Sequence, residues 1–277
     1  MDQFYCEVCN QCSRLITKRY STSFSLGIRV FNKKFRNPIY AIYGFVRFAD
    51  EIVDSFHGSN KKELLHRFRA ETFLAIKEGI SLNPVLQSFQ AVVNKYNIDH
   101  HHIEAFLESM EMDLYNDVYD QNSFKKYIYG SAEVVGLMCL HIFCPDNTEY
   151  ERLKPYAQSL GSAFQKINFL RDIRSDYEER GRTYFPDLDF HNFTATEKER
   201  IEKDIKAEFD HAYIGIKELP KSVRFGVYLS YVYYLSLFKK IKGFSPKKII
   251  SERIRINNRR KLILLTKCAI KNSLNML

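Results

Sequence analysis

Two carboxylates stand four residues apart in a stretch that is otherwise apolar. In residues 39–56 (IYAIYGFVRFADEIVDSF), Asp50 precedes Asp54 by four residues and follows Arg47 by three. Apolar and aromatic residues cover every face of a helix formed by this stretch, which is typical of a buried helix. Two like charges on a buried helix are unfavourable unless cations join them. Arg47 supplies one positive charge, and a hard divalent metal such as Mg²⁺ would supply the rest.

A second stretch, residues 165–176 (QKINFLRDIRSD), carries a single polar stripe. Its amide and carboxylate side chains recur at spacings of three, four and four, and they are Gln165, Asn168, Asp172 and Asp176. On a helix they form one row about 16 Å long, with Arg171 and Arg174 beside it. The preceding residues are apolar, so we expect the row to line an internal cavity. Two such helices could hold the diphosphate of an apolar substrate through magnesium; a structural network of ion pairs is the alternative.

The same four-residue spacing occurs twice more. Asp113 and Asp117 form a third pair, and Asp204 and Glu208 share a face of a charge-rich segment. Charge-rich helices usually present such residues to solvent. We therefore expect a solvated face for Asp204 and Glu208.

Helical periodicity runs through nearly the whole chain, and no alternating strand pattern longer than a few residues competes with it. Asp99 is a predicted N-cap, Thr196 and Glu199 resemble a capping box, and 181–193 is a predicted irregular loop. The predicted helices cover 38–56, 61–78, a segment from 84, 100 to about 119, 123–141, 149–176, 196–217, 221–242 and the basic C-terminus. With no linker or repeat visible, the sequence predicts one all-α domain over residues 1–277.

Composition and charge narrow the class of protein. The chain is 45% apolar and 27% charged, which is typical of a globular protein, and it contains no run of ~20 apolar residues that would span a membrane. The N-terminus lacks a basic region followed by an apolar core, so we expect a cytoplasmic protein. Residues 239–261 hold ten Lys/Arg and one acid, and thus account for the net charge of +9. Such a segment could meet nucleic acid, anionic lipid or a phosphorylated substrate, or form a solvated basic helix pair.

Three further patterns carry weaker signals. Cys6, Cys9 and Cys12 have iron–sulfur spacing, but Ile16 stands where a fourth cysteine is needed, which favours ordinary thiols. The Asp-His-His-His run at 99–102 has no partner motif, so we expect it to be exposed at a helix start. The small residues Gly130, Ala132 and Gly136 leave room for an alkyl chain or for close helix packing.

With these residues in view, the chain resembles the squalene/phytoene synthase family, which joins two prenyl diphosphates head to head. The resemblance covers nearly the full length. The similar segments are YSTSF (20–24), AIYGFVRFADEIVD (41–54), FLESMEMDL (106–114), YIYGSAEVVGLM (127–138) and GSAFQKINFLRDIRSDYEERGRTYFP (161–186). Two departures stand out. Glu133 puts an acid in a helix expected to line the pocket, and the first acidic motif reads Asp-Glu-Ile-Val-Asp rather than Asp-Asp-x-x-Asp.

The resemblance implies a single-domain helical bundle of the isoprenoid-synthase type around a central apolar cavity. The implied magnesium ligands are Asp50, Asp54, Asn168, Asp172 and Asp176. The implied diphosphate contacts are Ser21, Ser23, Arg47, Gln165 and Arg253, with Asn168, Arg171 and Arg182 as further substrate-binding residues. Tyr129, Arg182 and Tyr184 are expected beside the reacting carbons or closing the site. Rings such as Phe24, Tyr40 and Tyr43 could stabilise cations, although plain core packing is the commoner role at helical spacing.

The implied reaction is an ionisation assisted by metals and arginines, followed by attack of the second substrate's double bond and a cyclopropyl diphosphate intermediate. Segments 136–138 and 181–186 are closest to the phytoene branch, which uses geranylgeranyl diphosphate. A squalene or dehydrosqualene synthase using farnesyl diphosphate is the sibling alternative, and only its reductive form would need NADPH. The choice between Mg²⁺ and Mn²⁺ and the oligomeric state stay open.

An alternative of another class is a non-catalytic helical module that uses its basic C-terminal segment on RNA or an anionic membrane. That segment matches no RNA-binding signature, so no nucleic-acid partner is expected. An enzyme and a membrane contact are compatible, because basic residues near an anionic surface each contribute about 1 kcal/mol to docking. We therefore expect possible peripheral contact with the inner face of the membrane.

Overall fold

The computed structural model describes residues 2–274, without the side chains of Thr22 and Ser23, and 79% of these described residues are helical. The elements in chain order are α1 (Gln3–Tyr20), α2 (Thr22–Arg29), α3 (Lys33–Asp54), α4 (Lys61–Glu78), α5 (Pro84–Tyr96), α6 (His100–Met112), α7 (Gln121–Ile128), the π-helical turn η1 (Tyr129–Glu133), α8 (Val134–Phe143), α9 (Asn147–Arg180), α10 (Ala195–Glu218), α11 (Lys221–Lys242), α12 (Pro246–Ser251) and α13 (Asn258–Ser273). The all-α prediction is confirmed. Within residues 2–274, no helix is both long and apolar enough to cross a membrane.

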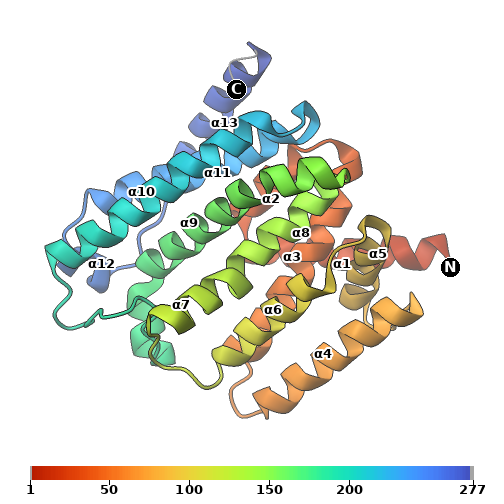
Figure 1. The fold of residues 1–277 in the computed structure, drawn as a ribbon, viewed down its shortest axis with the longest axis horizontal. Helices are drawn as coiled ribbons and strands as arrows, with labels where there is room; N and C mark the ends of the chain where they lie inside the picture. Colours follow the sequence, from red (N-terminus) through yellow and green to blue (C-terminus); the bar gives the residue numbers. More distant parts are fainter. Residues whose placement is uncertain (1, 275–277) are drawn as a thin grey trace.

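The helices pack side by side around two apolar clusters (Figure 1). One cluster draws mainly on α2 to α6 and α8, with contributions from the starts of α9 and α11, and the other on α7 and α9 to α13. Helix α10 packs along α9, and α1 packs along α3 and α5. Residues from both clusters line one internal cavity. The space that a substrate could enter therefore lies between the clusters, flanked by α3 and α9.

Local sequence signals explain where α9 begins and ends. The Asp146 side chain accepts a hydrogen bond from the Glu149 amide at 2.9 Å and caps the N-terminus. Gly181 ends the helix with a positive φ of 70°, a conformation that glycine adopts without steric cost. The chain then reverses, and the Arg182 amide donates to the Asp176 carbonyl at 2.8 Å. This turn directs the 181–193 loop, which was predicted as irregular, back toward the polar end of α9.

Several helix boundaries were predicted correctly. Helix α4 begins at Lys61 and is closed by Gly79, α5 begins at Pro84, and Asp99 caps α6. The Tyr-rich α11 ends before Gly243, as predicted.

Other boundaries were wrong by two to seven residues. Helix α3 begins at Lys33, because Asn32 is the N-cap, so Pro38 lies inside the helix rather than at its start. Helix α6 ends at Met112 instead of near Tyr119. The capping box belongs to Thr194 and Glu197, two residues before the predicted pair. The predicted 123–141 helix is interrupted by η1.

Two predictions of solvent exposure were also wrong in part. Glu208 accepts hydrogen bonds from Lys166 (2.7 Å) and Ser162 (2.6 Å) on α9, because α10 packs along that helix, whereas Asp204 remains exposed. His102 is buried and lies 2.9 Å from the Tyr150 hydroxyl. The run at 99–102 was expected to be exposed. His100 and His101 are exposed, but His102 lies on the inner face of α6 and is therefore buried.

Candidate active site

The cavity has a volume of about 680 Å³ and changes from apolar to polar along its length. On α3 its lining runs from Ile39 to Asp54, about 22 Å at the rise of an α-helix. On α9 the lining begins with Leu153 and ends with Asp176 and Arg180. Both helices thus present apolar residues from their N-terminal halves and carboxylates from their C-terminal halves. A ligand with a charged head and a long apolar tail fits this gradient.

The two acidic rows face the same polar end and are joined by arginines. Arg180 lies between the helices, 3.5 Å from Asp54 on α3 and 3.1 Å from Asp176 on α9. Arg182, from the loop after α9, donates to Asp54 at 3.0 Å. The predicted rows from two separate helices therefore converge on one cavity.

Each remaining carboxylate of the rows also has an arginine neighbour. Asp50 lies 3.7 Å from Arg47 on the same helix. Asp172 accepts from the Nε of Arg171 at 2.9 Å and from the Nε of Arg253 at 2.7 Å. Arg253 comes from the segment between α12 and α13, so the C-terminal part of the chain contributes to the polar end.

The arginines do not fully compensate the carboxylates. Burial raises the pKa of Asp50 to about 7, against the effect of Arg47, and Asp54 raises it further. Burial and the neighbouring Asp172 raise the pKa of Asp176 to about 7, against the effect of Arg180. A raised carboxyl pKa means that the charged form is unfavourable where it lies. This end of the cavity therefore favours additional positive charge.

The donor chemistry fits magnesium. Four carboxylates and the Asn168 amide supply the hard oxygens that Mg²⁺ prefers, and burial raises the pKa of two of them, Asp50 and Asp176, so a further cation there would be favourable. Within the described residues, no three His, Cys, Asp or Glu side chains lie close enough to form a metal site by themselves. Proteins often hold Mg²⁺ through one or two carboxylates together with phosphate oxygens, so the donor types present fit this ion without forming a complete site by themselves.

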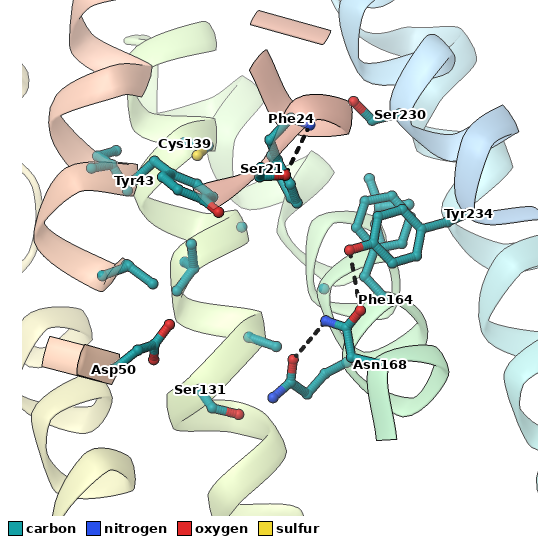
Figure 2. A pocket seen from close by; sticks show the side chains of 18 of the residues that line it. Ser21, Phe24, Tyr43, Asp50, Ser131, Cys139, Phe164, Asn168, Ser230 and Tyr234 are labelled. Atoms are coloured by element: carbon teal, nitrogen blue, oxygen red, sulfur yellow. Dashed lines mark hydrogen bonds between the residues drawn. The ribbon is translucent and has the colours of Figure 1, made fainter. Parts of the chain in front are cut away.

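Polar groups from α11 and from the N-cap of α2 also line the cavity (Figure 2). Asn168 donates to the Gln165 amide oxygen at 3.2 Å, and the Tyr234 hydroxyl of α11 donates to Asn168 at 3.3 Å. The Ser21 hydroxyl caps α2 by accepting from the Phe24 amide. In Figure 2, Tyr43 and Asp50 of α3 face the pocket from the side opposite Phe164 and Asn168 of α9.

Asp113 is a further residue of the site, whose role the sequence did not reveal. Its buried carboxylate accepts hydrogen bonds from the hydroxyls of Tyr119 (3.1 Å), Tyr127 (2.7 Å) and Tyr184 (3.0 Å). The Arg182 guanidinium also donates to the Asp113 carbonyl at 2.9 Å. Burial raises the pKa of Asp113 to about 6, although Arg182 and Tyr127 lower it. Only the spacing to Asp117 drew attention to Asp113, and Asp117 itself is exposed.

The expected position of Tyr129 was wrong. Tyr127 and Ser131 line the cavity four residues apart, and Tyr129 lies midway between them on the other side of the turn. Its ring centroid is 6.4 Å from that of His101 on α6. The π-helical turn begins at Tyr129 and adds a residue to the helical turn, which the sequence pattern did not predict. Tyr127, and not Tyr129, is therefore the tyrosine of this segment that lines the cavity.

Glu133 also points elsewhere than expected. It is not among the lining residues, because its carboxylate accepts from the Gln158 amide of α9 at 2.9 Å. Close packing accounts for Gly130, where a Cβ would come within 2.4 Å of the Ala105 carbonyl. Ala132 and Gly136 line the cavity, so both interpretations of this small-residue row hold in part.

The structure brings most of the predicted site residues to one cavity. Those that line it are Ser21, Arg47, Asp50, Asp54, Gln165, Asn168, Arg171, Asp172, Asp176, Arg182, Tyr184 and Arg253. Phe24 and Tyr43 also line it, whereas Tyr40 is buried in the core. The side chain of Ser23 lies outside the described residues.

Comparisons with known proteins identify a matching family model, curated relatives and solved structures of the same fold. The family model described as squalene/phytoene synthase matches residues 17–260. Phytoene synthase 2 from Solanum lycopersicum is 29% identical over 259 residues, 86% of this chain and 82% of its own. The 4,4'-diapophytoene synthase of Staphylococcus haemolyticus is 26% identical over 211 residues, 73% of this chain and 70% of its own. A crystal structure of a dehydrosqualene synthase superposes with a TM-score of 0.83 over 99% of both chains, at 20% identity, which supports the fold.

Proposed function

Because the chain belongs to the squalene/phytoene synthase family, we propose that it condenses two geranylgeranyl diphosphates head to head to phytoene. The proposed route passes through a cyclopropyl diphosphate, with release of diphosphate. The observation that carries the proposal is the convergence of two carboxylate rows, from α3 and α9, on the polar end of a mainly apolar cavity. The plant phytoene synthases among the relatives favour the C20 substrate. Farnesyl diphosphate, as used by the squalene and dehydrosqualene branch, is the second candidate.

The polar end would bind the two diphosphates. Asp50, Asp54, Asn168, Asp172 and Asp176 would hold Mg²⁺ or Mn²⁺, which acts as a Lewis acid on the diphosphate leaving group. The diphosphate oxygens would accept hydrogen bonds from the arginines that now pair with these carboxylates, chiefly Arg47, Arg171 and Arg253, because guanidinium groups match phosphate geometry.

The apolar end would protect the allylic cation. Its mainly apolar lining would keep water away from the cation, which water would otherwise capture as an alcohol. The rings of Phe164 and Tyr234 stack at a centroid distance of 3.8 Å beside Asn168, and Phe24 lies 5.4 Å from Tyr43. Aromatic faces stabilise cations electrostatically. We propose that these four rings flank the reacting carbons.

The last step in forming phytoene is loss of a proton. Tyr127 faces the cavity and donates its hydroxyl hydrogen to Asp113 at 2.7 Å. Its oxygen can accept a proton from the substrate as its own proton passes to Asp113, whose pKa of about 6 suits a general base near neutral pH. We propose this pair as the proton acceptor.

The test is to incubate pure protein and Mg²⁺ with geranylgeranyl or farnesyl diphosphate separately, and to measure released diphosphate and hydrocarbon mass. We expect a C40 product from the C20 substrate, and Asp172→Asn should abolish it. Asp210→Asn, an exposed aspartate paired with Lys206 on α10, is the matched control and should retain full activity. A C30 product from farnesyl diphosphate alone would establish the second candidate. Failure to release diphosphate from either substrate would refute the proposal.

A further inference from the structure

Helix α13 is apolar on two opposite sides. Its inner side packs against α11 through Leu264 and Cys268, both buried, and the Tyr233 hydroxyl donates to the Lys261 carbonyl at 3.1 Å. Figure 1 shows α13 running beside α11 with its C-terminal end projecting past the other helices. The inner side therefore explains how α13 is held, but not why the other side is apolar.

The outer side carries several large apolar residues, with Arg259, Thr266 and Ser273 between them. Its large members are exposed by 64% (Leu262), 48% (Ile263), 54% (Ile270) and 62% (Leu274). At 100° per residue these four side chains fall within one third of the helix circumference, and Ala269 lies beside them. The row is centred opposite Leu264 and Cys268. We refer to Leu262, Ile263, Ala269, Ile270 and Leu274 as the outer row.

Basic residues accompany the outer row, and acidic residues do not. Arg260, Lys267 and Lys271 recur at spacings of seven and four, so they form a parallel row along its edge, and Arg259 lies at its start. No acidic residue occurs after Glu252. Clusters of this composition on an amphipathic helix are attracted to anionic lipid headgroups, while the apolar side chains enter the acyl boundary.

We propose that the outer row of α13 docks the protein on the surface of an anionic lipid bilayer. A second copy of the chain is a poorer partner, because two such helices face to face would bring Arg and Lys together without any carboxylate to pair with them. RNA is also a poorer partner, because phosphate contacts would leave the four large aliphatic side chains in water. The bilayer alone matches both the charge and the apolar row.

The docking helix is directly connected to the polar end of the cavity. Arg253, which lines that end and pairs with Asp172, lies only five residues before α13. Docking would therefore hold this end of the cavity near the lipid surface. The inference does not depend on which prenyl diphosphate is used, or on whether the protein is an enzyme.

The test is co-sedimentation of the full-length protein with vesicles of phosphatidylcholine, with or without phosphatidylglycerol. We expect binding only to the anionic vesicles, weakening as salt is raised. Lys267→Gln/Lys271→Gln should weaken binding roughly 30-fold, at about 1 kcal/mol per lysine. Ile263→Ser/Ile270→Ser should weaken it at least tenfold, from lost apolar burial.

The matched control is Leu74→Ser/Lys77→Gln on α4, which changes an exposed leucine and a nearby exposed lysine on another helix and should bind like the wild type. Circular dichroism should show equal folding for all variants, because every altered side chain is exposed. Equal binding to both kinds of vesicle, or equal loss with the α4 control, would overturn the proposal. Two further results would overturn it. One is that Ile263→Ser/Ile270→Ser dissociates a dimer of the protein without changing vesicle binding. The other is that the protein binds RNA and does not bind vesicles.

Discussion

Replacing Asp50 by asparagine should stabilise the metal-free protein while abolishing its proposed activity. Burial raises the pKa of this carboxyl from 3.8 to about 7, so its charged form is unfavourable in the folded state. Because the folded-state pKa is raised, the native state binds more protons than the unfolded state between these two values. The stability of the native protein therefore falls as the pH rises from about 4 to about 7.

The size of the effect follows from the same two pKa values. At about 1.4 kcal/mol per pKa unit, the change from 3.8 to about 7 gives an upper bound of about 4 kcal/mol. The Asp50 side chain is 31% exposed to the cavity, so solvent screening reduces this value to about 2 kcal/mol. Asparagine cannot ionise and avoids this cost. We expect Asp50→Asn to gain about 2 kcal/mol near pH 8 and less than half of that near pH 4.5.

The assay is urea denaturation with a chelator present, at both pH values, for the wild type, Asp50→Asn and Asp210→Asn. Asp210 is 61% exposed and serves as a control that should change by no more than about 0.5 kcal/mol at either pH. An Asp50→Asn variant no more stable than the wild type near pH 8 would show that the carboxylate is adequately neutralised. The inferred shortage of positive charge would then be wrong.

Three other substitutions probe the site and the helix packing. Tyr127→Phe should lower turnover about 100-fold because it removes the proposed proton acceptor. Tyr129→Phe should keep turnover within about twofold of the wild type. Equal effects of the two variants in steady-state assays would contradict the placement of these two rings. Gly161→Ala puts a Cβ within 2.6 Å of the Ala132 carbonyl oxygen and should lower the free energy of unfolding, measured by thermal denaturation, by about 2 kcal/mol. Gly243→Ala is its control, because its Cβ would meet no atom closer than 3.5 Å, and it should lower stability by less than about 1 kcal/mol. Lys166→Met should lower the free energy of unfolding, measured in urea, by about 3 kcal/mol because Glu208 loses its buried partner. The double variant Lys166→Met/Glu208→Met should recover most of that loss. A double variant as unstable as the single one would contradict the ion-pair explanation.

The helices and the acidic rows could be predicted because both depend on short-range periodicity. The spacing of Asp50 and Asp54, and of Asn168, Asp172 and Asp176, places each set on one helix face whatever the rest of the fold does. Their convergence on one cavity was an expectation based on their apolar setting. It is met because α3 and α9 both present their C-terminal halves to the same space.

The parts that could not be predicted depend on contacts between distant segments. Asp113 becomes central only because the hydroxyls of Tyr119, Tyr127 and Tyr184 come to it from separate segments. Glu208 looks solvated in its own helix, yet Lys166 of α9 lies against it. The displacement of Tyr129 follows from a π-helical turn, which leaves no periodic signal in a single sequence.

Arg180 joins Asp54 to Asp176, and with its neighbours it gives the resting pocket an internal set of counterions. Ligand entry would therefore be an exchange of ionic partners, in which guanidinium groups become available to diphosphate only when another cation occupies the aspartates. In such an exchange, bound metal increases the affinity of the pocket for diphosphate. By thermodynamic linkage, bound diphosphate must increase the affinity for metal by the same factor.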